Sequence, residues 1–344
     1  MTELVDQLAD LTALRDRDAL DITLVTTIND LVQPQTVAIC RVVGDAGNER
    51  WLTTAQMGAG QSTPTSDSAW SKLDLLPKLA TRPLREQAVA LRQVTQSDGE
   101  TNVTVFPLTG APGASGVLEI VTNEALPAQS QILVSGVLRL YLNFQNLLDY
   151  GERDALTELL NRKTFDGAFL KATIEQNQAV ANSQDDRRNM AHAIGSYWLA
   201  MIDIDHFKRV NDNFGHLIGD EVLLLLARLM RACFRFHDQL YRFGGEEFVV
   251  LMRCNGESEA AGALERLRTT TESHLFPQVG HISISIGFSE VKTGDTPSGA
   301  FERADKAVYY AKEHGRNQVS SYAGLIARGD LVEQAANVGD MELF

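Results

Sequence analysis

Two consecutive glycines, Gly244 and Gly245, lie between two strand-like runs and constrain this chain of 344 residues more than any other feature. The run before them, Asp238–Phe243, and the run after them, Phe248–Met252, are typical of β-strands. Because glycine adopts positive φ without steric cost, the pattern predicts a β-hairpin with a tight turn at the glycine pair.

Two adjacent carboxylates, Glu246 and Glu247, follow the predicted turn. Holding two carboxylates together is costly unless a cation neutralises them. A turn without side chains also lets a bulky anion approach the backbone. The heptad Arg242–Phe248 therefore points to a metal ion with a phosphate, and the alternative is an acidic hairpin on a solvated surface.

A second motif begins with the apolar run Tyr197–Ile202, which predicts a buried strand. The strand leads into Asp203-Ile204-Asp205-His206-Phe207-Lys208, and Gly219 and Asp220 follow. Together with the hairpin, these separately spaced motifs resemble the GGDEF family of diguanylate cyclases, in the Gly-Gly-Glu-Glu-Phe spelling. The resemblance covers residues 154–322, which are predicted to form the catalytic domain. It implies an α/β domain with a central, mostly antiparallel sheet.

The bulk composition is that of a globular protein, with 44% hydrophobic and 22% charged residues. A formal net charge of −14 argues against a nucleic-acid partner. The three cysteines have no zinc-type spacing and indicate reduced thiols of a cytoplasmic protein. No apolar run approaches 18 residues and the N-terminus does not read as a signal peptide, so we expect no membrane span.

The N-terminal segment, residues 1–128, is predicted to be a separate domain. Helical periodicity runs to Pro34, and strands are expected at 36–43, 102–108 and 117–121. The order of strand, glycine-rich turn, strand and flanking helices resembles a GAF domain, which gives the whole chain the fold class α/β (α+β). The resemblance leaves open whether this domain binds a small-molecule ligand as a sensor or is a ligand-free dimerisation module.

Residues 129–153 are predicted to form a linker helix. Apolar residues recur there at alternating spacings of four and three: Leu133, Val137, Leu140, Phe144 and Leu147. The spacing favours a short two-stranded parallel coiled coil, and hence a homodimer. The alternative is an apolar helix face that packs on its own domain.

The catalytic domain opens with Asp154–Phe165, which matches the family's first motif except that glycine is usual at Glu158. The following helix is expected to end near Gln176, and the polar residues 177–193 to form a loop insertion. A last helix is expected at 300–314, a strand at 281–288 and a closing strand at 317–322. Residues 323–344 are expected to be a tail or a docking helix.

The resemblance implies that two GTP molecules condense into cyclic di-GMP with release of two pyrophosphates. It implies that Mg²⁺ (or Mn²⁺) is held by Asp203, Glu246 and the backbone carbonyl of Ile204. Either Glu246 or Glu247 could deprotonate the attacking 3′-hydroxyl, and the sequence does not divide these roles.

The resemblance also implies the substrate contacts. The matching positions are Phe207, Asn211, His216, Asp220, Gly244 and Gly245, with Lys208, Lys312 and Arg316 as cations for the phosphates and Lys208 counted with the catalytic groups. A carboxylate at Asp220 accepts from guanine N1–H and the 2-amino group, which favours GTP over ATP. Lys312 and Arg316 are four residues apart and share one face if the helix persists.

Arg235 and Asp238 lie just before the hairpin, at the spacing of the family's product-inhibition site, and Arg266 matches its secondary arginine. An arginine fork can bond the O6/N7 edge of guanine. The simpler alternative is a surface ion pair between Arg235 and Asp238.

The leading interpretation is a cytoplasmic homodimeric diguanylate cyclase, in which cyclic di-GMP is both product and feedback inhibitor. Three alternatives compete with it: an inactive cyclic di-GMP receptor, a cyclase that makes mixed dinucleotides, and a scaffold that only dimerises. Intact carboxylates at Asp203, Glu246 and Glu247 argue against the receptor, and Asp220 argues against relaxed base choice.

Overall fold

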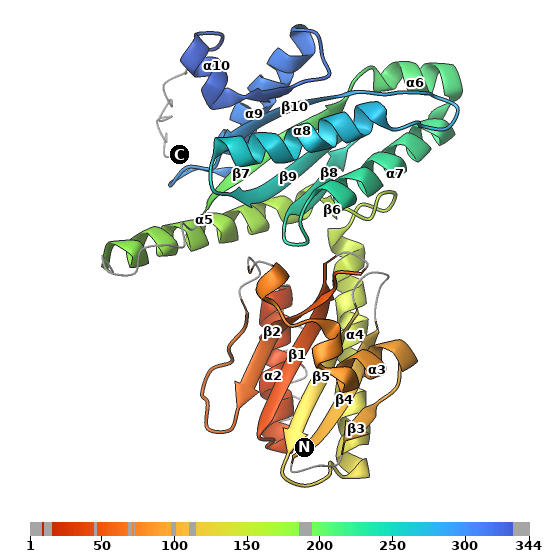
Figure 1. The fold of residues 1–344 in the computed structure, drawn as a ribbon, viewed down its shortest axis with the longest axis vertical. Helices are drawn as coiled ribbons and strands as arrows, with labels where there is room; N and C mark the ends of the chain where they lie inside the picture. Colours follow the sequence, from red (N-terminus) through yellow and green to blue (C-terminus); the bar gives the residue numbers. More distant parts are fainter. Residues whose placement is uncertain are drawn as a thin grey trace, which may run out of the picture. The chain divides into compact units, whose positions relative to one another are not determined.

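The computed structural model of the chain describes residue 9 and residues 16–44, 47–67, 71, 73–97, 101–109, 115–185 and 195–332. The chain forms two compact units, Met1–Gly151 and Glu152–Phe344, each of which is treated by itself below (Figure 1). In the described part of the chain, no helix combines the length and the apolar character that a membrane crossing needs.

The N-terminal unit is built on a five-stranded sheet in the order β2-β1-β5-β4-β3. Every neighbouring pair in this sheet is antiparallel. The strands are β1 (Thr36–Val43), β2 (Arg50–Gly58), β3 (Thr95–Ser97), β4 (Asn102–Thr109) and β5 (Ser115–Thr122). The three strands that the sequence predicts here are therefore confirmed, as is an antiparallel sheet with flanking helices.

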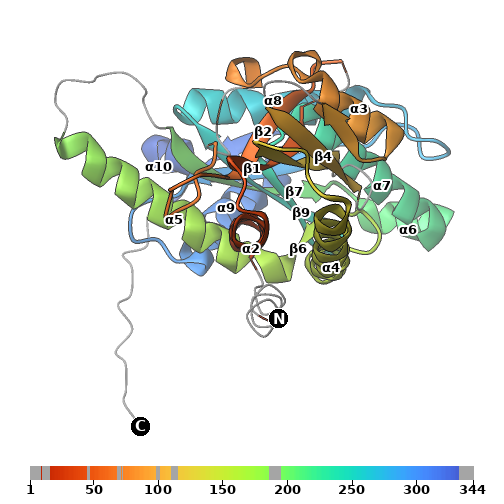
Figure 2. The same cartoon turned by 90° about the horizontal axis from the view of Figure 1, so that it is seen from below.

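Helices cover both faces of this sheet (Figure 2). On one face lie α2 (Arg17–Val32) and α4 (Ala128–Glu152), and on the other lies α3 (Pro83–Leu91) with the 3₁₀ turn η2 (Leu79–Thr81). A further 3₁₀ turn, η1 (Leu73–Leu75), precedes η2 in the chain. Successive side chains of β1 point to opposite faces of the sheet. Val37 and Ile39 pack under α2 and α4, whereas Ala38 and Cys40 pack toward α3. Two hydrophobic cores thus share one sheet.

The predicted seam on α4 divides between two environments. Val137 is 3% exposed and Phe144 packs against the core of its own unit. Leu133, Leu140 and Leu147, which are seven residues apart, are 39%, 45% and 64% exposed. The alternative of a self-packed face is therefore right for two of the five seam positions, because α4 must also cover its own sheet.

The C-terminal unit contains a six-stranded sheet in the order β11-β10-β7-β9-β8-β6. Its central pairs are antiparallel, and the outer pairs β10–β11 and β6–β8 are parallel. The strands are β6 (Leu160–Asn161), β7 (Ser196–Ile204), β8 (Gln239–Gly244), β9 (Glu247–Cys254), β10 (Ile284–Glu290) and β11 (Val319–Ser321). The predicted hairpin is formed by β8 and β9, and the mostly antiparallel sheet is confirmed.

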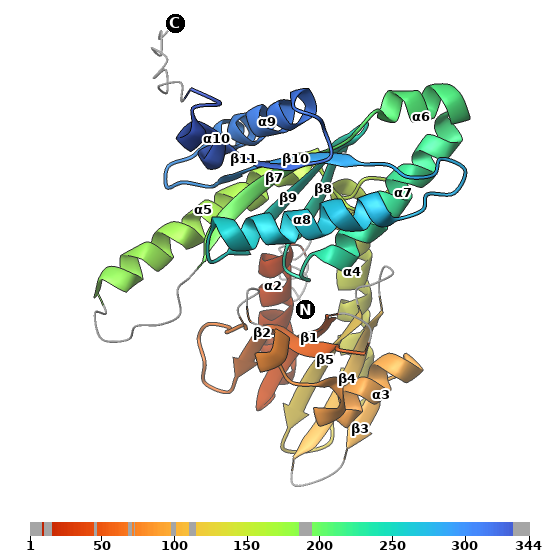
Figure 3. The same ribbon diagram turned by 45° about the horizontal axis from the view of Figure 1, so that its top comes forward.

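This second sheet is also covered on both faces (Figure 3). One layer contains α6 (Phe207–Phe214), α7 (His216–Cys233) and α8 (Glu257–Ser273), and the other contains α5 (Arg162–Asp185), α9 (Pro297–Glu313) and α10 (Tyr322–Arg328). Strand β7 is buried on both faces from Tyr197 to Ile204, which explains its unbroken apolar run. Helix α9 approaches β10 so closely that a Cβ on Gly287 would lie 2.1 Å from the backbone nitrogen of Val308.

Two expectations about boundaries are wrong. Residues 177–185 continue helix α5 rather than forming a loop, because the segment is rich in alanine and glutamine and contains neither glycine nor proline. For the segment after residue 322, the described residues agree with the docking-helix alternative, because helix α10 packs on α9 through Leu325 and Ala307. Strand β10 begins at Ile284, later than predicted, and nearly all of it is buried. Residues 186–194 and 333–344, and the N-terminal leucines before residue 16, lie outside the described residues.

Candidate functional site

The C-terminal end of β7 brings Asp203 next to the carboxylates of the hairpin. Asp203 is opposite Glu247 in the antiparallel register of β7 and β9. Directly opposed residues of an antiparallel pair point to the same face, so these two carboxylates are neighbours. The Nζ atom of Lys312, at the end of α9, lies 2.7 Å from Oδ2 of Asp203 on that face.

The turn between β8 and β9 has the backbone that the glycines predict. Gly244 has φ of 147° and Gly245 has φ of 52°, and the strand register shifts between Arg242 and Gly244. The guanidinium of Arg242 donates to the carbonyl of Gly245 through Nε (3.2 Å) and Nη2 (3.0 Å). Its Nη1 atom donates to Asp154 at 3.0 Å. Asp154, the first residue of the family's opening motif, is therefore linked to the turn through Arg242.

The carboxylate of Asp154 has hydrogen-bond donors besides Arg242. Its carboxylate accepts from the backbone N–H and the hydroxyl of Thr157 at 2.8 and 2.7 Å. Burial acts to raise the pKa of Asp154, but the hydrogen bonds from Thr157 and Arg242 outweigh it and lower the pKa. At neutral pH the carboxylate is charged and holds the arginine in place.

Asp203 and Glu246 are poorly satisfied by comparison. Burial raises the pKa of Asp203, Lys312 counteracts this effect in part, and the charges of Glu247 and Asp205 add to it. Burial likewise raises the pKa of Glu246, and the neighbouring charge of Asp203 raises it further. The protein concentrates negative charge here beyond what Lys312 neutralises, as expected where a further cation binds.

The donor set fits a hard divalent cation. Asp203 and Glu246 offer carboxylate oxygens and Ile204 a backbone carbonyl, and Mg²⁺ prefers oxygen ligands with few protein groups among them. Among the described residues, no cluster of three or more histidine, cysteine, aspartate or glutamate side chains could hold a metal by itself. Because Mg²⁺ is octahedral, the three groups named above leave positions in its shell for waters or substrate oxygens.

The predicted base-recognition residues come together where α6 meets α7. A Cβ on Gly219 would lie 2.0 Å from Oδ1 of Asn211 and 3.3 Å from the ring of Phe207. The Asn211 carboxamide therefore rests directly on Gly219, the residue before Asp220. His216 is the first residue of α7 and, like Asp220, is exposed.

Two of the three predicted phosphate cations lie at helix ends, and the third lies in the loop after α9. Lys208 is exposed in the first turn of α6, and Lys312 lies in the last turn of α9. Helix α9 ends at Glu313, and Arg316 has φ of 61°, so Lys312 and Arg316 do not share a helical face. A shared face required the helix to continue as far as Arg316. It does not continue, because Gly315 permits the chain to leave the helix.

The predicted inhibitory residues are engaged within the unit. Arg235 donates to Glu259 at 2.8 Å, and Arg266 donates to the carbonyl of Cys233 through Nε (3.2 Å) and Nη2 (2.6 Å). Asp238 accepts from the backbone N–H of Arg235 at 2.8 Å, and burial raises its pKa to about 6. The alternative of an Arg235–Asp238 side-chain pair does not occur, because Glu259 takes the guanidinium.

Comparison with known proteins identifies this half of the chain. Residues 152–318 match the family model described as diguanylate cyclase, GGDEF domain. Residues 152–318 are a GGDEF domain. It is 40% identical over 169 residues to diguanylate cyclase DgcP of Pseudomonas aeruginosa, an alignment of 48% of this chain and 23% of that protein. It is 36% identical over 166 residues to diguanylate cyclase DgcM of Escherichia coli, covering 48% of this chain and 37% of that one.

Solved GGDEF domains are similar as well. The GGDEF domain of DgcB from Caulobacter crescentus, in complex with c-di-GMP, is 32% identical, with a TM-score of 0.44 and coverage of 50% of this chain and 93% of that one. The active GGEEF domain of a diguanylate cyclase from Vibrio cholerae is 33% identical, with a TM-score of 0.40 and coverage of 48% and 97%. The chain spans less than half the length of the curated cyclases named above.

Sequence reasoning missed two residues of the GGDEF domain that the structure places at the site. Arg242 belongs to the signature heptad but was given no role, and its bridge to Asp154 spans 88 residues of sequence. Asp205 is the second acid of the Asp203-Ile204-Asp205 run and is only 6% exposed. The signal for Asp205 was an acidic residue directly after a buried strand.

Proposed function

We propose that the chain is a diguanylate cyclase, which condenses two GTP molecules into cyclic di-GMP and two pyrophosphates. The observation that carries the proposal is the meeting of Asp203, Glu246 and Glu247, with raised pKa values at Asp203 and Glu246, beside a glycine turn and Lys312. An excess of negative charge beside an open turn suits a cation and a triphosphate rather than a purely structural pair.

In this proposal Asp203, Glu246 and the carbonyl of Ile204 hold Mg²⁺ or Mn²⁺. Bound there, the ion would neutralise charge that develops on the phosphoryl oxygens. Glu246 or Glu247 accepts the proton of the 3′-hydroxyl, whose oxygen forms a new ester bond to the α-phosphorus of the opposite GTP. The bond from that phosphorus to the bridging oxygen breaks, and pyrophosphate leaves with the electron pair.

The remaining residues hold the nucleotide. Asn211 and Asp220 read the guanine edge from the α6–α7 corner, where Phe207 lies beside Gly219 and His216 is the first residue of α7. Lys208, Lys312 and Arg316 neutralise the triphosphate, and the Gly244–Gly245 turn leaves room for it. On binding, Lys312 would exchange its contact with Asp203 for one with phosphate, which would leave the Asp203 carboxylate available to hold the metal ion.

The reaction needs two such domains face to face, so we propose that the chain acts as a homodimer. Leu133, Leu140 and Leu147 on α4 support this, because they form an exposed apolar row at the seven-residue spacing of a coiled coil. Sedimentation equilibrium should give a dimer, and Leu140→Glu should shift it to monomer with loss of turnover. A dimer that survives Leu140→Glu would place the interface elsewhere.

We propose further that the GAF-like unit regulates the cyclase and that cyclic di-GMP inhibits it at Arg235, Asp238 and Arg266. Since GTP is a cytoplasmic nucleotide, we expect the protein to act in the cytoplasm. Product binding would require Arg235 to leave Glu259. Arg235→Ala should therefore abolish inhibition by added cyclic di-GMP, and equal inhibition of parent and variant would reject the site.

The test of the activity is incubation of the purified protein with GTP and Mg²⁺, after removal of bound nucleotide, with products separated by chromatography. We expect cyclic di-GMP and pyrophosphate in a ratio of about one to two, and neither from the Glu246→Gln/Glu247→Gln variant. If the parent binds cyclic di-GMP but makes none, the chain is a receptor. Products that contain adenine would point to a mixed-dinucleotide cyclase.

A further inference from the structure

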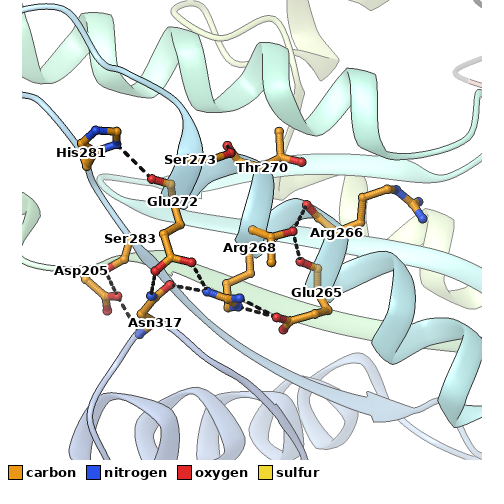
Figure 4. A network of polar contacts seen from close by, with 11 residues as sticks. Asp205, Glu265, Arg266, Arg268, Thr270, Glu272, Ser273, His281, Ser283 and Asn317 are labelled. Carbon is orange, nitrogen blue, oxygen red and sulfur yellow. Dashed lines mark hydrogen bonds and ion pairs between the residues drawn. The ribbon is translucent and has the colours of Figure 1, made fainter.

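Asp205 lies two residues beyond Asp203, and Figure 4 shows it beside Ser283 and Asn317. Its carboxylate accepts from the hydroxyls of Ser283 and Ser285, each at 2.6 Å, and from the backbone N–H of Asn317 at 3.0 Å. Its own N–H donates to the carbonyl of Ser283 at 2.9 Å. A buried carboxylate with three donors is fully satisfied, so it fixes the backbone directly after the proposed metal ligands.

The backbone that Asp205 holds on its other side is strained. Gly315, Arg316 and Asn317 have φ values of 110°, 61° and 46°. Arg316 and Asn317 are therefore non-glycine residues in the left-handed region, which persists only where the surroundings impose it. One of the two residues held in this conformation is Arg316, a proposed phosphate cation.

Helix α8 supplies the second restraint, through the side chain of Asn317 (Figure 4). The Nδ2 atom of Asn317 donates to Glu272 at 2.7 Å, and its Oδ1 atom accepts from Arg268 at 2.9 Å. Arg268 donates to Glu272 at 2.8 Å and to Glu265 at 2.6 Å. Both ends of the Asn317 carboxamide are thus held, and by groups that are themselves paired.

These contacts form one connected unit, the clasp: Asp205, Ser283, Ser285, Asn317, Arg268 and Glu272. The clasp joins the loop after β7, which directly follows Asp203 and Ile204 at the end of the strand, to the loop after α9, which carries Arg316. These loops are more than 100 residues apart in the sequence, since the Asp205–Asn317 hydrogen bond spans 112 residues. None of the clasp residues is among the proposed ligands of the metal or the nucleotide.

We infer that Asn317 is a positioning residue for the triphosphate, and that it fixes the left-handed backbone of Arg316 against Asp205 and α8. The inference rests on the proposed function of the same site. A nucleoside triphosphate must meet the metal carboxylates and Arg316 at once, so the distance between the two loops determines how well it binds. The clasp sets that distance before the nucleotide arrives.

The decisive experiment is a double-mutant cycle between Asn317 and Arg316. Asn317→Gly keeps the left-handed backbone accessible and the N–H that Asp205 accepts, but it removes the anchor to α8. The measured quantity is the Kd of a GTP analogue with a methylene bridge between the α- and β-phosphates, determined by calorimetry with Mg²⁺ on the full chain.

We expect Asn317→Gly to weaken binding of the analogue about tenfold. In the Arg316→Ala background the same change should have less than about a twofold effect, because Asn317 acts through Arg316. Equal effects in both backgrounds would overturn the inference, since they would mean that Asn317 only supports the fold. An unchanged Kd for Asn317→Gly alone would overturn it as well.

Helix α8 offers a matched control. Glu265 and Glu272 both pair with Arg268, but only Glu272 also contacts Asn317. Glu272→Ala should weaken binding of the analogue, whereas Glu265→Ala should leave it unchanged, and equal Kd values for the two variants would contradict the clasp. If the parent protein binds the analogue but makes no cyclic di-GMP, the cyclase proposal is wrong, and the double-mutant cycle still tests the role of Asn317 in nucleotide binding. A parent that does not bind the analogue would end both.

Discussion

Two buried aspartates, one in each unit of the chain, have opposite surroundings. In the N-terminal unit, Asp21 is 5% exposed and accepts from the hydroxyls of Tyr141 and Thr54 and from Arg41. In the C-terminal unit, Asp203 is 8% exposed and has one cation, Lys312, with further carboxylates beside it. The two aspartates are equally buried, but only the first is surrounded by donors.

A second pair in the N-terminal unit repeats its pattern. Arg85 donates to Glu119 through Nε (2.8 Å) and Nη2 (2.6 Å), and its guanidinium lies 5.9 Å from the ring centre of Trp51. Here each charge has its partner in bidentate geometry. Burial alone therefore does not mark a functional carboxylate, whereas burial with like charges and too few donors does.

The largest expected effect follows from Asp203→Asn. Removing a proposed metal ligand should lower the rate of cyclic di-GMP formation at least about a thousandfold. The same change should stabilise the C-terminal unit at neutral pH. Because the folded-state pKa of Asp203 is raised, its charge destabilises the fold as pH rises through that pKa. Chromatographic turnover and calorimetric unfolding at pH 7 measure the two effects.

Asp21→Asn is the counterpart in the other unit and should behave in the opposite way. It leaves Arg41 without a charged partner and disturbs Tyr141, so we expect a loss of roughly 3 kcal/mol in the free energy of unfolding. If the Asn variants at 21 and 203 shift their unfolding transitions in the same direction, the contrast between the two units is not real.

The next effect concerns pH and Asp238. Burial raises the pKa of this carboxyl from 3.8 to about 6, so its charged form is disfavoured in the fold. The contribution of the Asp238 carboxyl to the free energy of unfolding is therefore fully present below about pH 4, and it is lost as the pH rises through about 6. Asp238→Asn should match the parent at pH 4 and be more stable at pH 8, by roughly 3 kcal/mol at most. Urea unfolding at both pH values tests this, and a constant difference would show that Asp238 titrates normally.

Two helical glycines give a smaller effect and compare the units directly. Gly219→Ala in α7 must displace Asn211, whose Oδ1 would lie 2.0 Å from the new Cβ, so we expect KM for GTP to rise about tenfold. Gly136→Ala in α4 meets nothing within 4 Å, and it should raise stability by about 0.5–1 kcal/mol without changing KM. Initial-rate kinetics and thermal unfolding of both variants separate the outcomes. A KM that is unchanged in Gly219→Ala would remove Asn211 from the nucleotide site.

Much of the fold could be read from the sequence because its signals are local. Strand β7 is an unbroken apolar run, and the glycine pair specifies the hairpin turn. Asp203 and Glu246 could be assigned because each follows such a signal directly. Helix ends were harder, since α5 passes residue 176 without a breaker and α9 stops before Arg316.

The contacts that orient the site were out of reach for a different reason. Arg242 reaches Asp154, and Asp205 reaches Asn317, across 88 and 112 residues. Glu259 takes the guanidinium of Arg235, although Asp238 is closer in sequence. Such partners depend on how strands and helices pack, which no spacing rule encodes.

The smallest expected effect concerns Glu158, which has φ of 58° where glycine is usual in the GGDEF family. A residue with a side chain costs about 1–2 kcal/mol of folding free energy in the left-handed region, and glycine avoids this cost. Part of the stability gained is lost again, because glycine raises the conformational entropy of the unfolded chain. Glu158→Gly should therefore stabilise the C-terminal unit by roughly 0.5–1 kcal/mol without changing turnover. Gln33→Gly is its N-terminal match, because Gln33 has φ of 50° after helix α2. Calorimetry should show each variant raising the transition of its own unit, since the strain is local. A loss of stability in Glu158→Gly would mean that the side chain contributes more, through its charge near Arg231, than its backbone costs.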